Sequence, residues 1–411
     1  MNYTLNKAIS LASAAVALGL TAPALGANVI YLTGSTAFRG NCYGVLSTAG
    51  AAGGLWDTAP DIATFGNANP AGCNYMLFHG FITNVETYVS CLWSGSEAGI
   101  ASVAGNSVDN APYGPLAGAP ATFLKADGTV PYGNNTANPS SGELESGPRA
   151  ADLSMADTSS AVSMSSSFTL HNFGKVGIVP FTWAKGIQST PLPAWNRITN
   201  ITDPQIRVLL GFPQPAAFLT GNPADTNYVY PVGRNKGSGT RVNCLASSGY
   251  GVTTPVVQFA VGGIPFNNTL TLVEVDNNGY ESGGDVAKSL SVDGSQAQPD
   301  PNFGGTGWLA IGYLGTSDAQ SASLTTANWL TLNGVMESDG AIEEGQYSYW
   351  GNEHLYGANG ISGYKLAFGN TFIALIGNKL GGSVPTAHSS GISLRYMHAQ
   401  KITDTAVPTR L

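Results

Sequence analysis

The sequence predicts an α/β fold with two lobes, and two observations support this prediction. Apolar runs that end in glycine, serine and threonine lead into helix-forming segments at several places along the chain. This order of strand, small-residue turn and helix is the unit from which α/β sheets are built. The chain has 411 residues, which is long enough for two lobes that each bury a core.

The clearest of these units spans residues 228–241. The apolar run Tyr228–Val232 precedes the sequence Gly-Arg-Asn-Lys-Gly-Ser-Gly-Thr-Arg, and a helix is expected to start within that turn. Free backbone N–H groups at a helix start, with hydroxyls beside them, form a site for an anion. The residues that could hold one here are Arg234, Gly237, Ser238, Gly239 and Thr240. A blander alternative is a serine–glycine helix entry beside a solvated arginine.

Three further runs end in similar turns. They are Ile30–Phe38, Thr87–Ile100 with Ser94-Gly-Ser96 at its turn, and Ala151–Asp157, which ends in a carboxylate. Turns of this kind gather at the carboxyl ends of the strands of an α/β sheet, where ligands bind. The four turns are therefore expected to meet at one site.

These motifs, in this order, resemble the secreted phosphate-binding proteins of ABC phosphate transporters, in the type 2 periplasmic-binding superfamily. The resemblance covers most of residues 28–375, with insertions. It implies a hinge strand and a following helix, a return crossing and a late strand, at 176–180, 198–206, 308–313 with 332–335, and 347–356.

The resemblance also implies how the lobes divide. Lobe 1 is expected at 28–178, lobe 2 at 179–312, and a return to lobe 1 with a C-terminal segment at 313–411. The two crossings are expected near Val176–Thr182 and Ile311–Leu314. Residues 106–150 are rich in glycine, proline and asparagine, which predicts a surface insertion that is either passive or close to the cleft.

The site implied by the resemblance binds phosphate through hydroxyls, backbone N–H groups and one arginine. Asp157 would accept the proton that hydrogen phosphate carries and sulfate lacks, because a carboxylate repels a fully ionised anion. The alternatives for Asp157 are an ion pair with Arg39 or Arg149, or a helix cap over Ser159 and Ser160. The predicted ligand-binding residues are Ser35, Thr36, Ala37, Phe38, Ser96, Asp157, Arg234, Ser238, Gly239 and Thr240.

Two positions depart from the family pattern. The residue before the Gly-Ser-Gly-Thr turn is often acidic in the family and braces the arginine, whereas here it is Lys236. The site is then expected to be more positive and to accept an organophosphate or another oxyanion. Glu97 follows Ser96 and is expected to point away from the anion.

Two local patterns predict helices. Asp203–Leu210 begins with Thr202 or Asp203 as N-cap and Pro204 in the first turn, and Gly211 ends it. The run Tyr364–Ile376 is apolar enough for a buried helix.

Composition bounds the function. The net charge of −8 argues against nucleic acid and anionic membrane surfaces as partners, but not against a small anion held by local donors. Residues 1–27 have the basic start, short apolar run and small-residue end of a signal peptide. No later run reaches the ~18 apolar residues of a membrane span. We therefore expect an exported protein, periplasmic or extracellular, and the resemblance implies that it works with the membrane subunits of an ABC transporter.

The remaining residues do not favour catalysis or a cofactor. The five histidines lack metal-ligand spacing, and the chain has no Gly-x-Ser-x-Gly elbow. The four cysteines (Cys42, Cys73, Cys91 and Cys244) lack Cys-x-x-Cys spacing, and in an exported chain they suggest one or two disulfides, with Cys42–Cys73 favoured and free thiols as the alternative. The rival function is a secreted structural or surface-assembly protein that reuses the binding fold.

Overall fold

The computed structural model describes residues 28–65, 69–105, 150–160, 162, 167–261, 272–295, 308–321, 324–382 and 388–411. The predicted signal peptide at 1–27 lies outside the described residues. So does the predicted insertion at 106–150, apart from Ala150. Both therefore stay predictions.

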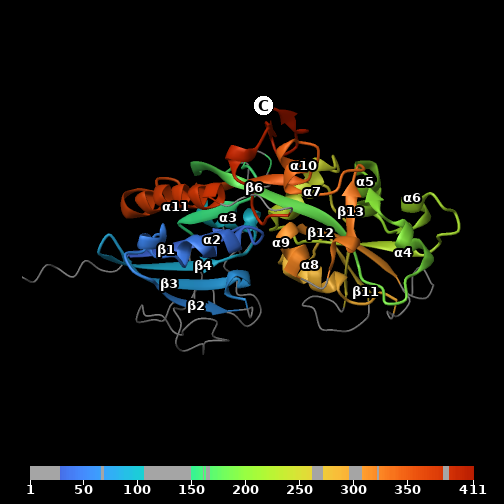
Figure 1. The fold of residues 1–411 in the computed structure, drawn as a ribbon, viewed down its shortest axis with the longest axis horizontal. Helices are drawn as coiled ribbons and strands as arrows, with labels where there is room; N and C mark the ends of the chain where they lie inside the picture. Colours follow the sequence, from blue (N-terminus) through green and yellow to red (C-terminus); the bar gives the residue numbers. More distant parts are fainter. Residues whose placement is uncertain are drawn as a thin grey trace, which may run out of the picture.

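The predicted α/β class is confirmed by a 14-stranded mixed sheet with helices along it (Figure 1). The main path of the sheet runs β11-β10-β9-β12-β6-β14-β5-β1-β4-β3-β2, with β7, β8 and β13 paired beside it. The strands are β1 (Asn28–Gly34), β2 (Asp61–Phe65), β3 (Tyr75–Ile82), β4 (Val85–Leu92), β5 (Leu153–Ala156), β6 (His171–Lys185), β7 (Asn200–Ile201), β8 (Gln214–Pro215), β9 (Tyr228–Val232), β10 (Gln258–Val261), β11 (Leu272–Asp276), β12 (Leu309–Gly315), β13 (Trp329–Leu332) and β14 (Trp350–Gly357), with β15 (Ala399–Gln400) and β16 (Thr409–Arg410) forming a separate pair.

Helices follow many of these strands. The α-helices are α2 (Arg39–Leu46), α3 (Ser96–Val103), α4 (Pro193–Arg197), α5 (Asp203–Gly211), α6 (Ala217–Thr220), α7 (Gly239–Ser247), α8 (Gly283–Leu290), α9 (Thr316–Ser321), α10 (Asp339–Glu343) and α11 (Gly363–Gly382). The 3-10 turns are η1 (Gly50–Ala52), η2 (Pro70–Gly72), η4 (Thr326–Asn328) and η5 (Leu394–Tyr396). Within the described ranges, each helix is too short or too polar to traverse a bilayer.

Strand β6 links two groups of strands that form the two lobes. Its first part pairs with β14 of the group β2-β3-β4-β1-β5-β14, and its last part, from Phe181, pairs with β12 of the group β12-β9-β10-β11. Figure 1 shows β6 running from one lobe into the other. The change of partner falls at Pro180, which has no N–H to donate to a ladder. The N–H of Phe181 donates instead to the carbonyl of Tyr349, at 3.3 Å.

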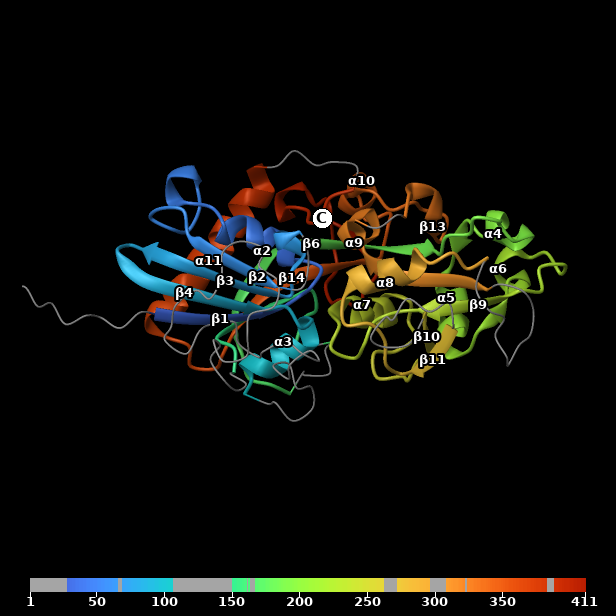
Figure 2. The same ribbon diagram turned by 90° about the horizontal axis from the view of Figure 1, so that it is seen from below.

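Both faces of the first-lobe sheet are covered because side chains alternate along each strand. On β1, Ile30 and Leu32 belong to a core with α2 and α11, whereas Val29 packs into a core with Ile100 and Val103 of α3. Figure 2 shows α3 and α11 on opposite sides of these strands. The ends of β1, β4 and β5 are thereby held together between the helix layers.

The return to the first lobe comes later in the chain than we expected. Strand β12 pairs with β6 and with β9, so Ile311–Leu314 lies in the second group of strands. Strand β13 pairs with β6 and β7 and also stays there. The chain rejoins the first group at β14, after the short helix α10. A short strand inside the second lobe and a strand that crosses between the lobes look alike in sequence. Only the strands with which each one pairs distinguish them.

Two local predictions can be compared directly with the structure. Helix α5 begins at Asp203, and its N-cap is Thr202, one of the two expected candidates. Thr202 also forms a capping box with Gln205, which we did not predict. Helix α11 extends beyond Tyr364–Ile376 at both ends, and it buries one side, through residues such as Phe368, Phe372 and Ile376, rather than its whole surface.

The expected disulfide is not present. All four cysteines are buried free thiols. Cys42 and Cys91 belong to the apolar core of the first lobe, and burial raises the pKa of both thiols. A free cysteine in such surroundings packs as a small apolar residue. The even number of cysteines is therefore not a sign of disulfide bonds here.

We predict that Gly34→Ala lowers the free energy of unfolding by more than about 3 kcal/mol. Gly34 ends β1 with φ +120°, and a Cβ there would lie 1.8 Å from the carbonyl oxygen of Met155 on β5. Gly53→Ala is the matched control, because Gly53 also has positive φ (80°) but faces open space. It should cost about 1 kcal/mol. Urea unfolding of both variants measures the difference, and equal losses would contradict the close approach of β1 and β5.

Candidate functional site

The four predicted turns meet where the two lobes face each other. From the first lobe come the turn after β1, the start of α3 after β4, and Asp157 at the end of β5. From the second lobe comes the turn after β9, where Ser238 is the N-cap of α7 and accepts a hydrogen bond from the N–H of Arg241 at 3.3 Å. The strand-turn-helix units at β1, β4 and β9 begin and end close to where the sequence indicates.

Asp157 is the centre of the first-lobe part of the site. Its carboxylate accepts hydrogen bonds from the hydroxyl of Ser96 at 2.7 Å and of Ser35 at 3.2 Å, and its side chain is almost fully buried. The carbonyl of Asp157 accepts from Nδ2 of Asn243, on α7 of the second lobe, at 2.7 Å. Asp157 therefore joins three elements of the first lobe to the second lobe.

The two alternative roles of Asp157, an ion pair with an arginine and a helix cap, do not match these contacts. Arg39 donates to the side-chain oxygen of Asn74. The N–H of Ser159 donates to Asp404 at 2.5 Å, and the N–H of Ser160 donates to the hydroxyl of Tyr356 at 3.1 Å. Asp157 thus does not cap the segment that follows it, and Arg149 lies outside the described residues.

Burial makes Asp157 harder to ionise. Desolvation raises its pKa from 3.8 to about 6, against the lowering effects of Ser96, Arg234 and Ser35, while Asp404 adds to the rise. A buried carboxyl group with a pKa of about 6 between two lobes is a candidate for a functional site.

Arg234 is the second-lobe partner, and its guanidinium is 1% exposed. Nε donates to the carbonyl of Tyr280 at 3.1 Å, and one terminal nitrogen donates to the carbonyl of Glu281 at 2.7 Å and to the hydroxyl of Thr36 at 3.1 Å. The other terminal nitrogen lies 3.5 Å from the hydroxyl of Thr240. Every one of these partners is neutral. Burial lowers the pKa of Arg234, and the more distant Asp318 and Asp157 oppose this.

Main-chain carbonyls replace the acidic brace that the family pattern would place beside the arginine. Lys236 is exposed and lies with Asn235 and Gly237 beside residues 275–278, away from the guanidinium. The carbonyl of Arg234 is held in turn by Arg241 at 3.1 Å and by Gln258 at 3.2 Å. Lys236 therefore does not add charge to the contacts of Arg234.

The two lobes touch closely beside Asp157. The carbonyl of Gly237 accepts from the N–H groups of Glu97 and Ala98, at 3.1 and 3.4 Å, at the start of α3. A Cβ on Gly239 would lie 1.6 Å from a carboxylate oxygen of Asp157. Glu97 itself is buried and accepts from Thr158 at 2.8 Å. The glycines of this turn thus allow the backbone of one lobe to reach the other.

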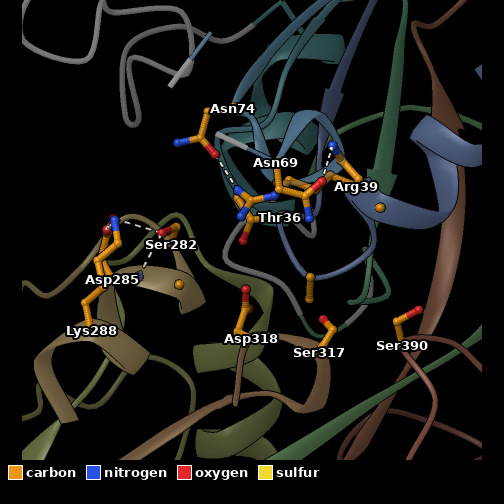
Figure 3. Close-up of a pocket in the computed structure, with 15 residues that line it drawn as sticks. Thr36, Arg39, Asn69, Asn74, Ser282, Asp285, Lys288, Ser317, Asp318 and Ser390 are labelled. Carbon is orange, nitrogen blue, oxygen red and sulfur yellow. Dashed lines mark hydrogen bonds and ion pairs between the residues drawn. The ribbon is translucent and has the colours of Figure 1, made fainter. Parts of the chain in front are cut away.

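The remaining predicted residues differ in which of their groups could contact a ligand. Phe38 is the N-cap of α2, and its ring lies in the first-lobe core, so only its backbone could face a ligand. The hydroxyl of Ser238 is engaged in its cap. Ala37 and Thr36 line a cleft between the lobes with a volume of about 480 Å³ (Figure 3).

Several residues of this region were missed by sequence reasoning. Glu353 on β14 is fully buried, with no hydrogen-bond partner for either carboxyl oxygen in the described part of the chain. Burial and nearby Asp157 raise its pKa well above the usual range. In the sequence, Glu353 stands out only as a charged residue within an expected strand. Asn243 and Asp404 were missed because each lies in an ordinary helix or tail sequence.

Comparison with known proteins gives limited similarity. No protein-family model matches the chain, and neither does any curated protein. Among solved structures, the chain is similar to a protein from Clostridium perfringens assigned as a phosphate ABC transporter substrate-binding protein, with bound phosphate, at 13% identity over 85% of this chain and 93% of that one, with a TM-score of 0.44. It is also similar to an ABC-type phosphate transport receptor from Vibrio cholerae at 14% identity (85% and 93% covered, TM-score 0.40) and to PstS from Borrelia burgdorferi at 12% identity (86% and 94% covered, TM-score 0.36). The residue roles proposed below rest on contacts within this chain.

We predict that Asp157 makes the protein less stable as pH rises from 4 to 7. Its folded pKa of about 6 lies above its ordinary 3.8, so the folded chain binds more protons than the unfolded chain in this window. Asp157→Asn removes this contribution. The stability of the variant relative to wild type should therefore rise across the window by up to about 3 kcal/mol.

Urea unfolding in phosphate-free buffer at pH 4, 5, 6 and 7 measures this difference. Gly53→Ala, which removes no titratable group and faces open space, serves as the control, and its pH profile should be parallel to that of wild type. Parallel pH profiles for wild type and Asp157→Asn would contradict the assignment.

Proposed function

We propose that this chain is an exported solute-binding protein that captures inorganic phosphate or a related oxyanion between its lobes for uptake by an ABC transporter. The observation that carries the proposal is the buried guanidinium of Arg234, whose hydrogen-bond partners are all neutral. Export rests on the predicted signal peptide at 1–27. The proposed role is binding, and we assign no reaction to the site.

An anion supplies what Arg234 lacks. A guanidinium cannot be deprotonated in a protein, so its burial is costly unless an opposite charge or a full set of hydrogen bonds compensates. Neutral partners satisfy some of its N–H groups, and the carboxyl groups of Asp318 and Asp157 act on its charge without being hydrogen-bonded to it. A phosphate oxygen beside Arg234, Thr36 and Thr240 would balance that charge and form strong charge-assisted hydrogen bonds.

Asp157 favours an anion that still carries a proton. Ser96 and Ser35 already donate to its carboxylate, which remains an acceptor with lone pairs to spare. Hydrogen phosphate can donate to such an acceptor, whereas sulfate cannot. The backbone N–H groups at the starts of α2 and α7 would add to the donor set, whereas those of Glu97 and Ala98 on α3 already donate to the carbonyl of Gly237.

We predict that Arg234→Ala weakens phosphate binding by about 2–5 kcal/mol, because it leaves anionic oxygens unpaired in a desolvated site. Isothermal titration calorimetry of the mature chain with inorganic phosphate measures the loss. Arg207→Ala is the matched control, since Arg207 on α5 donates to the carbonyl of Ser248. Circular dichroism checks that both variants fold. A folded Arg234→Ala variant that binds phosphate as wild type does would overturn the proposal.

We also predict that Asp157 sets the preference for phosphate over sulfate. In wild type the preference should be greater at pH 8 than at pH 6, because the carboxyl group, with its pKa of about 6, is ionised at pH 8 and repels sulfate. Asp157→Asn should lower the phosphate-to-sulfate affinity ratio at pH 8 by about tenfold, equivalent to ~1.4 kcal/mol. Competition binding at both pH values tests this. Equal binding of the two anions by wild type would remove the proposed role of Asp157.

A further inference from the structure

The cleft beside Thr36 is larger than an inorganic phosphate needs. Its volume is about 480 Å³. It falls in the range of about 300–1,000 Å³ that is typical of sites for small organic molecules. An ion of five heavy atoms held at Arg234 would leave most of this space to solvent.

Thr36 lies between the cleft and the proposed anion site, whose Arg234 and Asp157 are not among the residues that line the cleft. Thr36 is one of the lining residues, and the hydroxyl of Thr36 accepts a hydrogen bond from Arg234 at 3.1 Å. A ligand oxygen that meets both Arg234 and the cleft would therefore have to lie beside Thr36. An organic group bonded to that oxygen could then extend into the cleft.

Both lobes contribute polar groups to the cleft walls. Arg39, Asn69 and Asn74 lie on the first-lobe side, and Ser282 and Asp318 lie on the second-lobe side (Figure 3). Arg39 and Asp318 are each only 7% exposed, so their charges are held in place by the surrounding structure. Guanidinium, amide, hydroxyl and carboxylate groups together can both donate to and accept from alcohol groups. This lining suits a hydroxylated group and does not suit an apolar one.

We propose that the cleft binds the organic part of a hydroxylated phosphomonoester, such as a glycerol phosphate or a sugar phosphate, whose phosphoryl group is held by Arg234 and Thr36. This inference rests on the proposed function, and it names the ligand class that the same site would take. The outer cleft then acts as the specificity subsite, and closure of the lobes brings its two walls onto the ligand.

A glycine on α8 allows the cleft to be blocked without touching the anion site. Gly284 lines the cleft, and a Cβ there would meet only ordinary contacts, 3.7 Å from the hydroxyl of Ser282 and 3.8 Å from Asp318. Gly284→Phe therefore places a ring in the cleft. Gly340→Phe is the matched control, because Gly340 is also the second residue of a short helix, α10, and a Cβ there meets nothing within 4 Å.

The experiment is calorimetry of the mature chain with glycerol 3-phosphate, glucose 6-phosphate, inorganic phosphate, glycerol and glucose. At least one phosphomonoester should bind wild type as tightly as inorganic phosphate or more tightly, and glycerol and glucose should not bind. Gly284→Phe should weaken the phosphomonoester at least tenfold and change the affinity for inorganic phosphate less than twofold. Gly340→Phe should match wild type for both.

The two proposals fail in different ways. If inorganic phosphate binds and both phosphomonoesters bind more than 100-fold more weakly, the cleft inference is wrong and the proposed function stands. If Gly284→Phe weakens both kinds of ligand equally, the cleft is not a separate subsite and the inference is again wrong. If no phosphate compound binds wild type, the proposed function and the inference are both wrong.

Discussion

The burial of one permanent positive charge constrains the junction between the lobes. The guanidinium of Arg234 has almost no contact with solvent, and the second lobe holds it from behind through the carbonyls of Tyr280 and Glu281. Those carbonyls fix its orientation but cannot cancel its charge. The hydroxyl of Thr36, from the other lobe, accepts a hydrogen bond from the same guanidinium. The contact between the lobes therefore both shields the cation from water and places a hydroxyl of the first lobe beside it.

The glycines at this junction act through close approach. A side chain at Gly239 could not coexist with the carboxylate of Asp157, and the carbonyl of Gly237 reaches the N–H groups at the start of α3. That carbonyl is the negative end of a peptide dipole placed on the positive end of a helix. The proposed anion would have to compete with this carbonyl for the same N–H groups, so binding at that position and the contact between the lobes would use one set of donors.

Local sequence could predict the parts of the site that depend on neighbouring residues. Strand, turn and helix start follow one another directly, so the positions of Ser238 and of Thr202 as N-caps are visible in the chain. Contacts made over long sequence distances could not be found this way. Asn243 reaches Asp157 across 86 positions, and Asp318 faces Arg39 across the cleft. The cysteines show the same limit, because whether two thiols can pair depends on the direction of their Cβ bonds in the folded core.

The position of Pro180 has a consequence for how the lobes can rotate. A proline in the middle of a strand normally costs a ladder hydrogen bond, yet here it stands where β6 leaves β14 and begins to pair with β12. Separation of the two ladders at this point breaks no bond to Pro180, while the ring holds φ near −65° and removes one torsional degree of freedom. Rotation between the lobes must then use the ψ of Pro180 and the torsions of its neighbours. Any rotation between the lobes along β6 would thus meet one fixed backbone torsion at Pro180, which would confine the bending of the strand to the torsions on either side of it.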